Sequence, residues 1–127
     1  MNDWYARAVF FVKDAERSLH FYTAKLGFAV AWKFDQDGRA WVFQVELHGF
    51  ALILIQGYRE TEPRIGHGRV FIGLDPGEQT ESLRKQIEDR QIETTVITWG
   101  NTPTRVITDL DGNELFFWPS LTEGGGP

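Results

Sequence analysis

Two stretches of this chain begin in the same way. The first reads Arg7-Ala-Val-Phe-Phe-Val-Lys-Asp14 and the second Arg69-Val-Phe-Ile-Gly-Leu-Asp75. In both, a short apolar run that favours a β-strand leads into an aspartate that can cap a following helix. The repetition predicts two related structural units, one starting near residue 7 and the other near residue 69.

The two units also end alike. His48-Gly49 precedes Phe50-Ala-Leu-Ile-Leu-Ile55, and Asp111-Gly112 precedes Asn113-Glu-Leu-Phe-Phe-Trp118. Each pair is a tight-turn signal that is followed by a strand. Units of this size are too small to bury a sheet face alone, so we expect the two to close a cleft together. That cleft is the predicted location of function.

Length, composition and charge exclude several classes of protein. The chain has 127 residues, 42% of them hydrophobic, and a net charge of −5, which is ordinary for one globular domain. No basic run is present to neutralise phosphates, so nucleic acid is not an expected partner. The absence of cysteine excludes disulfides, thiolate metal sites and a cysteine nucleophile. Because no apolar segment resembles a signal peptide or a membrane span, we expect a cytoplasmic protein with no membrane partner.

Patterning within the first unit predicts the order βαβββ. Strands are expected over 6–12, 28–34, 39–47 and 50–56. Between the first two strands, apolar residues recur at helical spacing from Ala15 to Leu26, after the Asp14 cap and before Gly27 as a stop. Asp37-Gly38 marks a hairpin between the second and third strands.

The second unit repeats this order. Strands are expected over 68–74, 92–98, 103–108 and 113–118. A mostly exposed helix is expected around 79–91, starting from Asp75 as its cap with Pro76 in the first turn, and anchored by Leu83 and Ile87. Gly100-Asn101 is a predicted turn between strands.

These elements predict an α+β domain. It is built of two βαβββ modules whose curved mixed sheets surround a cleft. A single domain is expected over 1–121, with module 1 at about 5–56, a linker at 57–66, module 2 at about 67–118 and a flexible tail at 122–127.

Two phrases of the chain resemble a known superfamily. The first is Val12-Lys-Asp14 followed by Ser18-Leu-His-Phe-Tyr22 and Leu26-Gly-Phe28, and the second is Asp109-Leu-Asp-Gly-Asn-Glu-Leu-Phe-Phe117. Together with the doubled βαβββ order, they resemble the glyoxalase / bleomycin-resistance / extradiol-dioxygenase superfamily, also called vicinal oxygen chelate. Leu110 departs from the family's usual Pro. The resemblance spans nearly the whole chain and implies the two-module fold.

The resemblance also implies where a metal would bind in the family's enzymes. Their four ligands, usually His or Glu, come from the first and fourth strand of each module. The corresponding positions here are Arg7, Ile53, Arg69 and Phe116. Arginine stays protonated and would repel a cation, and Ile and Phe have no donor atom. We therefore expect no bound metal and no cofactor.

The resemblance then points to the metal-free binders of the bleomycin-resistance type. Such proteins sequester an antibiotic in a cleft at a dimer interface, without chemistry. The implied function is small-molecule binding, with an aromatic or amphipathic ligand. Two alternatives stay open: a glyoxalase- or dioxygenase-like enzyme with a displaced metal site, and an accessory domain that senses a ligand for a partner.

The candidate cleft residues follow from strand parity and from the resemblance. Residues two apart on a strand share a face, which groups Arg7 with Val9 and Phe11, Trp41 with Phe43, and Glu114 with Phe116 and Trp118. Aromatic side chains in place of metal ligands would give an apolar, stacking pocket. The complete candidate set is Arg7, Val9, Phe11, Trp41, Phe43, Ile53, His67, Arg69, Phe71, Glu114, Phe116 and Trp118.

Two charged features allow more than one interpretation. Arg7 and Arg69 are related by the repeat and form either a clamp on an anionic or carbonyl-bearing ligand or a structural pair bonded to carboxylates such as Glu46 or Glu114. His67 lies two residues before Arg69, and with one of those carboxylates it is the candidate for the displaced metal site.

The open sheets further predict a homodimer. Each module leaves a half-open curved sheet, and exposed apolar strand faces are a liability in a monomer. We expect a two-fold dimer with two equivalent clefts lined by Arg7, Ile53, Arg69 and Phe116. The linker is long enough either to keep both modules in one chain or to exchange them between chains.

Overall fold

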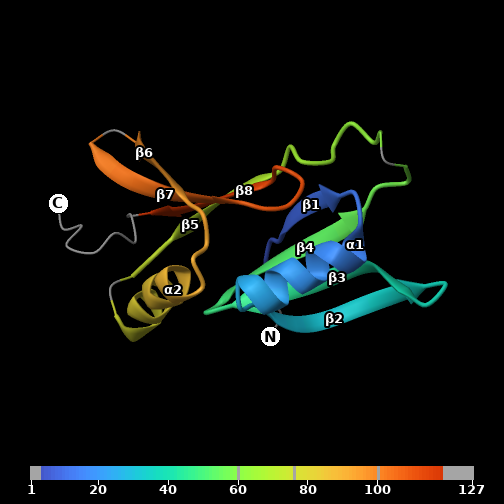
Figure 1. Ribbon diagram of the computed structural model, residues 1–127, viewed down its shortest axis with the longest axis horizontal. Helices are drawn as coiled ribbons and strands as arrows, with labels where there is room; N and C mark the ends of the chain where they lie inside the picture. The colour runs from blue at the N-terminus through green and yellow to red at the C-terminus, as the bar shows by residue number, and fades with distance from the viewer. Residues whose placement is uncertain (1–3, 60, 76, 100, 119–127) are drawn as a thin grey trace.

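Two four-stranded mixed sheets make up the protein, which confirms the predicted α+β fold of two βαβββ modules. The computed structural model describes residues 4–59, 61–75, 77–99 and 101–118. Figure 1 shows the two sheets side by side, each with its helix. The predicted tail at 122–127 lies outside the described residues. No helix in the described ranges is long and apolar enough to cross a membrane.

The first module follows the predicted order closely. Its elements are β1 (Ala8–Val12), α1 (Ala15–His20), the π-helical turn η1 (Phe21–Lys25), β2 (Ala29–Gln36), β3 (Arg39–Leu47) and β4 (Phe50–Gln56). The strand order is β1-β4-β3-β2, and β1 runs parallel to β4. Both predicted hairpin turns are present, with positive φ at Asp37 and His48. These turns join antiparallel strands, as two-residue hairpins require.

The second module repeats the topology. Its elements are β5 (Arg69–Gly73), α2 (Glu78–Asp89), β6 (Thr95–Trp99), β7 (Thr102–Thr108) and β8 (Glu114–Trp118). The strand order is β5-β8-β7-β6, with β5 parallel to β8. Residue 76, predicted in the first turn of the second helix, and residue 100, predicted in the turn at 100–101, lie outside the described residues.

The two helices start differently. Asp14 caps α1 as predicted, because its carboxylate oxygen Oδ1 accepts a hydrogen bond from the Arg17 backbone N–H at 3.2 Å. The predicted Asp75 cap is wrong: α2 begins at Glu78 behind Gly77, and no side chain caps it. The Asp75 carbonyl oxygen instead accepts a hydrogen bond from the Thr80 hydroxyl.

One hydrophobic core lies on the helix-bearing faces of the two sheets. It joins residues of both modules, such as Phe10 and Leu54 from the first and Leu115 and Phe117 from the second. Leu83 and Ile87, the predicted anchors of α2, are buried in it. The opposite faces of the sheets carry no helix, so they are left for function or association.

Strands, helices and side chains all form contacts between the two modules. β1 and β5 lie on neighbouring sheet edges (Figure 1), and the segment before β5 forms a bridge between Ile65 and Phe11. The Gln86 side chain of α2 donates a hydrogen bond to the Leu26 carbonyl at the end of η1. The Asn113 side chain donates to the Phe11 carbonyl at 3.1 Å. The two modules therefore share backbone contacts as well as a core.

Candidate functional site

The helix-free face of the first sheet is apolar and open. Val9 on the edge strand β1 and Ile53 on the adjacent strand β4 are register partners, and Phe11 lies two residues further along the same face. Val9 is exposed, and Ile53 and Phe11 are half-buried. The three side chains therefore share one surface: parity had grouped Val9 with Phe11, and the resemblance had added Ile53.

Two aromatic residues of this face were not among the candidate cleft residues predicted from the sequence. Trp32 and Phe34 on β2 pair with Gln44 and Val42, which belong to the open face, and they are 44% and 58% exposed. The Trp32 indole Nε1 donates a hydrogen bond to the Gln44 side-chain oxygen at 3.2 Å, which holds the ring on the strand. Exposed rings fixed in this way form a surface on which a planar ligand can stack.

Phe43 was predicted to line the cleft, and this prediction is wrong. Its side chain is fully buried in the core, because Phe43 pairs with Leu54 on the helix-bearing face. The register between β2 and β3 shifts between Phe34 and Asp35 and leaves Trp41 without a partner in the β2–β3 ladder. Trp41 is half-buried at this bulge. A bulge breaks the alternation on which the parity argument rested.

Aromatic side chains also lie on the open face of the second sheet. Phe71 on β5 pairs with Phe116 on β8, and Trp118 follows on the same face. The rings of Phe71 and Trp118 lie 6.1 Å apart between centroids in a tilted arrangement. Phe71 is 50% exposed, so this ring pair is accessible to a ligand or to another protein surface.

The two predicted arginines are held differently. The Arg69 Nε donates to the Glu114 carboxylate at 2.8 Å, which is the structural pairing considered for it. The Arg7 guanidinium lies 4.3 Å from the centroid of the exposed Tyr5 ring and donates to the Ala6 carbonyl. Within one chain, the arginines are therefore held by separate partners.

A cavity of about 540 Å³ lies between the modules. Arg7 lines it from just before β1, Ala51 from β4 and Phe71 from β5, and His48 contributes from the β3–β4 turn. Its volume is within the range of small-molecule sites. Arg69 is not part of its lining, so the cavity combines some of the predicted cleft residues and leaves out others.

The residues at the family's ligand positions do not fit a metal ion. Arg7, Ile53 and Phe116 offer no suitable donor, and the guanidinium of Arg69 binds Glu114. His67, the candidate for a displaced site, is exposed just before β5. In the described part of the chain, no group of three or more His, Asp or Glu side chains is arranged to hold an ion.

Two βαβββ modules, a cavity between them and an open face on each sheet together characterise a class of small two-module proteins, to which this chain conforms. The chain belongs to the Glyoxalase/Bleomycin resistance protein/Dioxygenase superfamily, which it matches over residues 4–117. This confirms the family resemblance carried by the two sequence phrases. No curated protein sequence matches the chain.

Solved structures with the same fold include both binding proteins and enzymes. The bleomycin-binding protein of bleomycin-producing Streptomyces verticillus, complexed with copper(II)-bleomycin, superposes with a TM-score of 0.70 at 15% identity, covering 94% of this chain and 98% of that one. TnmS3, an antibiotic binding protein from Streptomyces sp. CB03234, gives 0.59 at 18%, covering 92% and 97%. Lactoylglutathione lyase from Agrobacterium tumefaciens gives 0.62 at 15%, covering 91% and 92%. At these identities the likeness establishes the fold alone.

Proposed function

We propose that this protein is a metal-free small-molecule binder that sequesters an antibiotic in the manner of bleomycin-resistance proteins. The observation that carries the proposal is the chemistry of the four family ligand positions, which hold Arg7, Ile53, Arg69 and Phe116. Catalysis in the family's enzymes depends on a metal that polarises substrate oxygens. Without suitable ligands, the same surface serves binding better than catalysis.

The character of the open faces supports an aromatic or amphipathic ligand. The first sheet presents Trp32 and Phe34, and the second presents Phe71 and Trp118, all exposed to solvent. Aromatic rings provide large contact areas with a preferred stacking geometry. The ion pair between Arg69 and Glu114 adds a polar group of balanced charge beside the rings.

The proposal includes a homodimer, because each open face alone is only one wall of a binding site. In a two-fold arrangement, the first sheet of one protomer faces the second sheet of its partner, which gives two equivalent clefts. Burying both walls would remove the exposed apolar faces from water, and a ligand between them would lose most of its contact with solvent.

Titration with copper(II)-bleomycin tests the antibiotic role. Tryptophan fluorescence follows binding, since Trp32 and Trp118 lie on the open faces. We expect quenching at micromolar drug, a strongly weakened response for Trp32→Ala, and an unchanged affinity for Tyr58→Ala, which removes an exposed ring from the linker. If the wild-type protein shows no quenching, the bleomycin-type ligand is rejected.

Metal analysis tests the metal-free part of the proposal. The purified protein is loaded with Ni²⁺ or Zn²⁺, dialysed and measured for bound metal. We expect a content far below one ion per chain. A stoichiometric ion that is lost in His67→Ala would instead support the enzyme with a displaced site.

A further inference from the structure

A second cavity lies on the helix side of the molecule, away from the open sheet faces. It is open to solvent on one side and has a volume of about 720 Å³, which is within the range of small-molecule sites. The α1 and η1 helices form one wall, the start of β3 contributes Arg39, and the loop after β7 contributes Leu110. Both modules therefore line this helix-side cavity, which has no role in the function proposed above.

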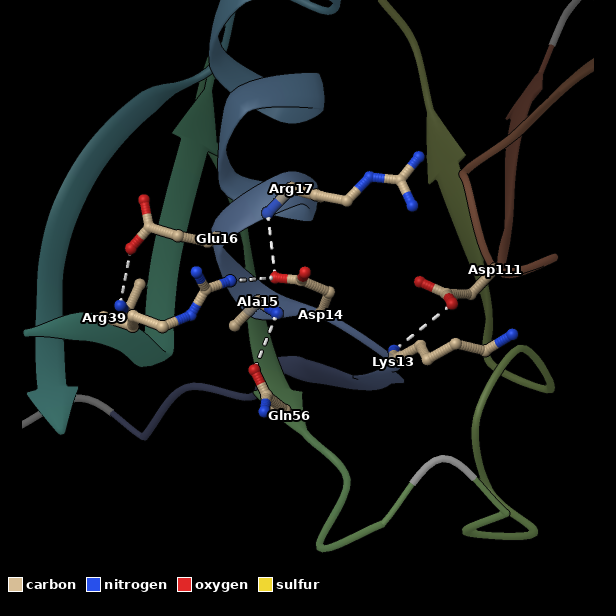
Figure 2. Close-up of polar contacts among 9 residues, drawn as sticks. Lys13, Asp14, Ala15, Glu16, Arg17, Arg39, Gln56 and Asp111 are labelled. Atoms are coloured by element: carbon tan, nitrogen blue, oxygen red, sulfur yellow. Dashed lines mark hydrogen bonds and ion pairs between the residues drawn. The ribbon is translucent and has the colours of Figure 1, made fainter. Parts of the chain in front are cut away.

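The carboxylates of the helix-side cavity are already engaged. Asp14 Oδ1 accepts hydrogen bonds from the Arg17 backbone N–H at 3.2 Å and from Arg39 Nη2 at 2.9 Å. Glu16 Oε1 accepts from the Ala40 backbone N–H at 2.7 Å. Figure 2 shows both acidic groups turned toward these donors. Their negative charge is therefore largely satisfied within the protein.

The cationic groups of the cavity are more available. The Arg17 guanidinium extends away from Asp14 in Figure 2 and forms no ion pair among the described residues, although its charge acts on the Asp111 carboxylate, where it opposes the burial that raises the pKa of that group. Lys25 is exposed, and its ammonium group donates a hydrogen bond to the Arg90 carbonyl at 2.9 Å. Because Arg39 is paired with Asp14, the lining keeps Arg17 and Lys25 against Glu16, a small excess of positive charge that is complementary to an anion.

Apolar groups lie beside these cations. Phe21 is half-buried in the cavity wall, and Leu110 is 49% exposed in the loop after β7. The loop itself is fixed, because the neighbouring Asp109 is buried and accepts a hydrogen bond from the Tyr22 hydroxyl. An apolar ligand group in contact with Phe21 and Leu110 would remove both side chains from water.

We propose that the helix-side cavity binds a small organic anion with an apolar body, such as an arylalkyl carboxylate. The carboxylate is bound by Arg17, and the apolar body packs against Phe21 and Leu110. Because Arg17 belongs to the first module and Leu110 to the second, the bound anion bridges the two modules. Binding therefore stabilises their arrangement by mass action.

The test uses 4-phenylbutyrate as the probe and 4-phenylbutyramide as its uncharged isostere, each titrated into ¹⁵N-labelled protein. We expect backbone amide shifts at Arg17, Ala24 and Leu110 and about tenfold tighter binding of the carboxylate than of the amide, as a charge-assisted hydrogen bond provides. Equal affinities for the two probes, or shifts confined to the open sheet faces, would overturn the proposal.

Matched variants separate the site from general charge effects. Arg17→Glu should weaken binding of 4-phenylbutyrate by about tenfold or more, and Leu110→Asp should weaken binding of both probes. Lys85→Glu, which makes the same charge change at an exposed position of α2, should leave binding unaltered, as should Trp32→Ala on the open face. An Arg17→Glu protein that keeps the wild-type affinity would contradict the assignment.

Discussion

Asp109 shows how one buried side chain organises a loop and joins two modules. One of its carboxylate oxygens accepts the backbone N–H groups of Asp111, Gly112 and Asn113. The other accepts the Tyr22 hydroxyl at 2.9 Å and the Asn113 side-chain amide at 3.0 Å. Burial, with the nearby Asp109 charge, raises the pKa of Tyr22 well above its usual value, so this hydroxyl stays a donor.

The neighbouring Asp111 provides a pH-dependent prediction. Burial raises the pKa of the Asp111 carboxyl, and the nearby Asp109 charge adds to the shift, although Asp111 Oδ1 accepts the Lys13 backbone N–H at 3.2 Å. A raised carboxyl pKa means that the charged form is less favourable in the folded state. Protonation therefore stabilises the protein below the unfolded pKa, and this stabilisation is lost as the pH rises through the folded pKa.

We therefore expect Asp111→Asn to raise the melting temperature at pH 7, because asparagine keeps the acceptor oxygen and removes the buried charge. The gain should shrink as the pH falls and vanish below about pH 4, where the wild-type carboxyl is also neutral. Thermal melts of both proteins across this range measure the effect. A wild-type protein that is the more stable one at pH 7 would show that the Lys13 interaction outweighs the burial cost.

Among the secondary-structure elements, most strands could be predicted from the alternation of apolar and polar residues and from the turn-forming residues that flank them. The bounds of β3 and β4 agree with the predicted 39–47 and 50–56, because each strand lies between clear turn signals. The residues that parity grouped in β1 and in β8 do share a face, because the pairings of these strands are regular. Parity failed where the β2–β3 ladder carries register shifts, since a bulge leaves no trace in the alternation of residue types.

The errors at the candidate site also lie in β2 and β3. Phe43 was assigned to the cleft although it is buried, and Trp32 and Phe34 were missed although they are exposed on the open face. Trp32 and Phe34 belong to β2, beside the register shifts of the β2–β3 pair, whereas Phe43 faces the core because it pairs with Leu54 in the regular β3–β4 ladder. The Arg69–Glu114 ion pair was one of two interpretations of Arg69, because the two residues start neighbouring strands. The sequence alone could not distinguish this ion pair from a clamp on a ligand.

The segment before β5 provides a prediction about how the modules are connected. Gly66 has φ +78° and approaches the Asp111 backbone carbonyl so closely that an added Cβ would collide with it. Gly38, in the β2–β3 turn, has nearly the same φ, +79°, but open space around it. Alanine at either position suffers the left-handed backbone strain, but only at Gly66 does it also displace a backbone.

Gly66→Ala should therefore destabilise the protein by about 3 kcal/mol, against about 1 kcal/mol for Gly38→Ala. Urea unfolding at equilibrium measures both changes. Equal losses for the two variants would mean that the loop containing Asp111 shifts readily, and that the contact between Gly66 and this loop does not position the second module.

For the whole molecule, the proposed dimer makes a prediction about mass. A single chain has a mass of 14.6 kDa, and light scattering at micromolar concentration should return twice this value. The reason is the exposed apolar area of the open faces, where Phe34 alone is 58% exposed. Apolar surface of this kind drives association when a complementary face is available.

Two substitutions on the same strand test which face associates. Phe34→Asp places a charge on the open face, since Phe34 pairs with Val42, and should convert the dimer to a monomer. Val30→Asp places the same charge on the opposite face, because Val30 pairs with the buried Val45, and at 44% exposure it should leave the dimer intact. A wild-type mass near 14.6 kDa would refute the dimer, and with it the claim that each cleft needs two chains. Dissociation by Val30→Asp alone would move the interface to the helix-bearing side, and the open faces would then remain free for ligand.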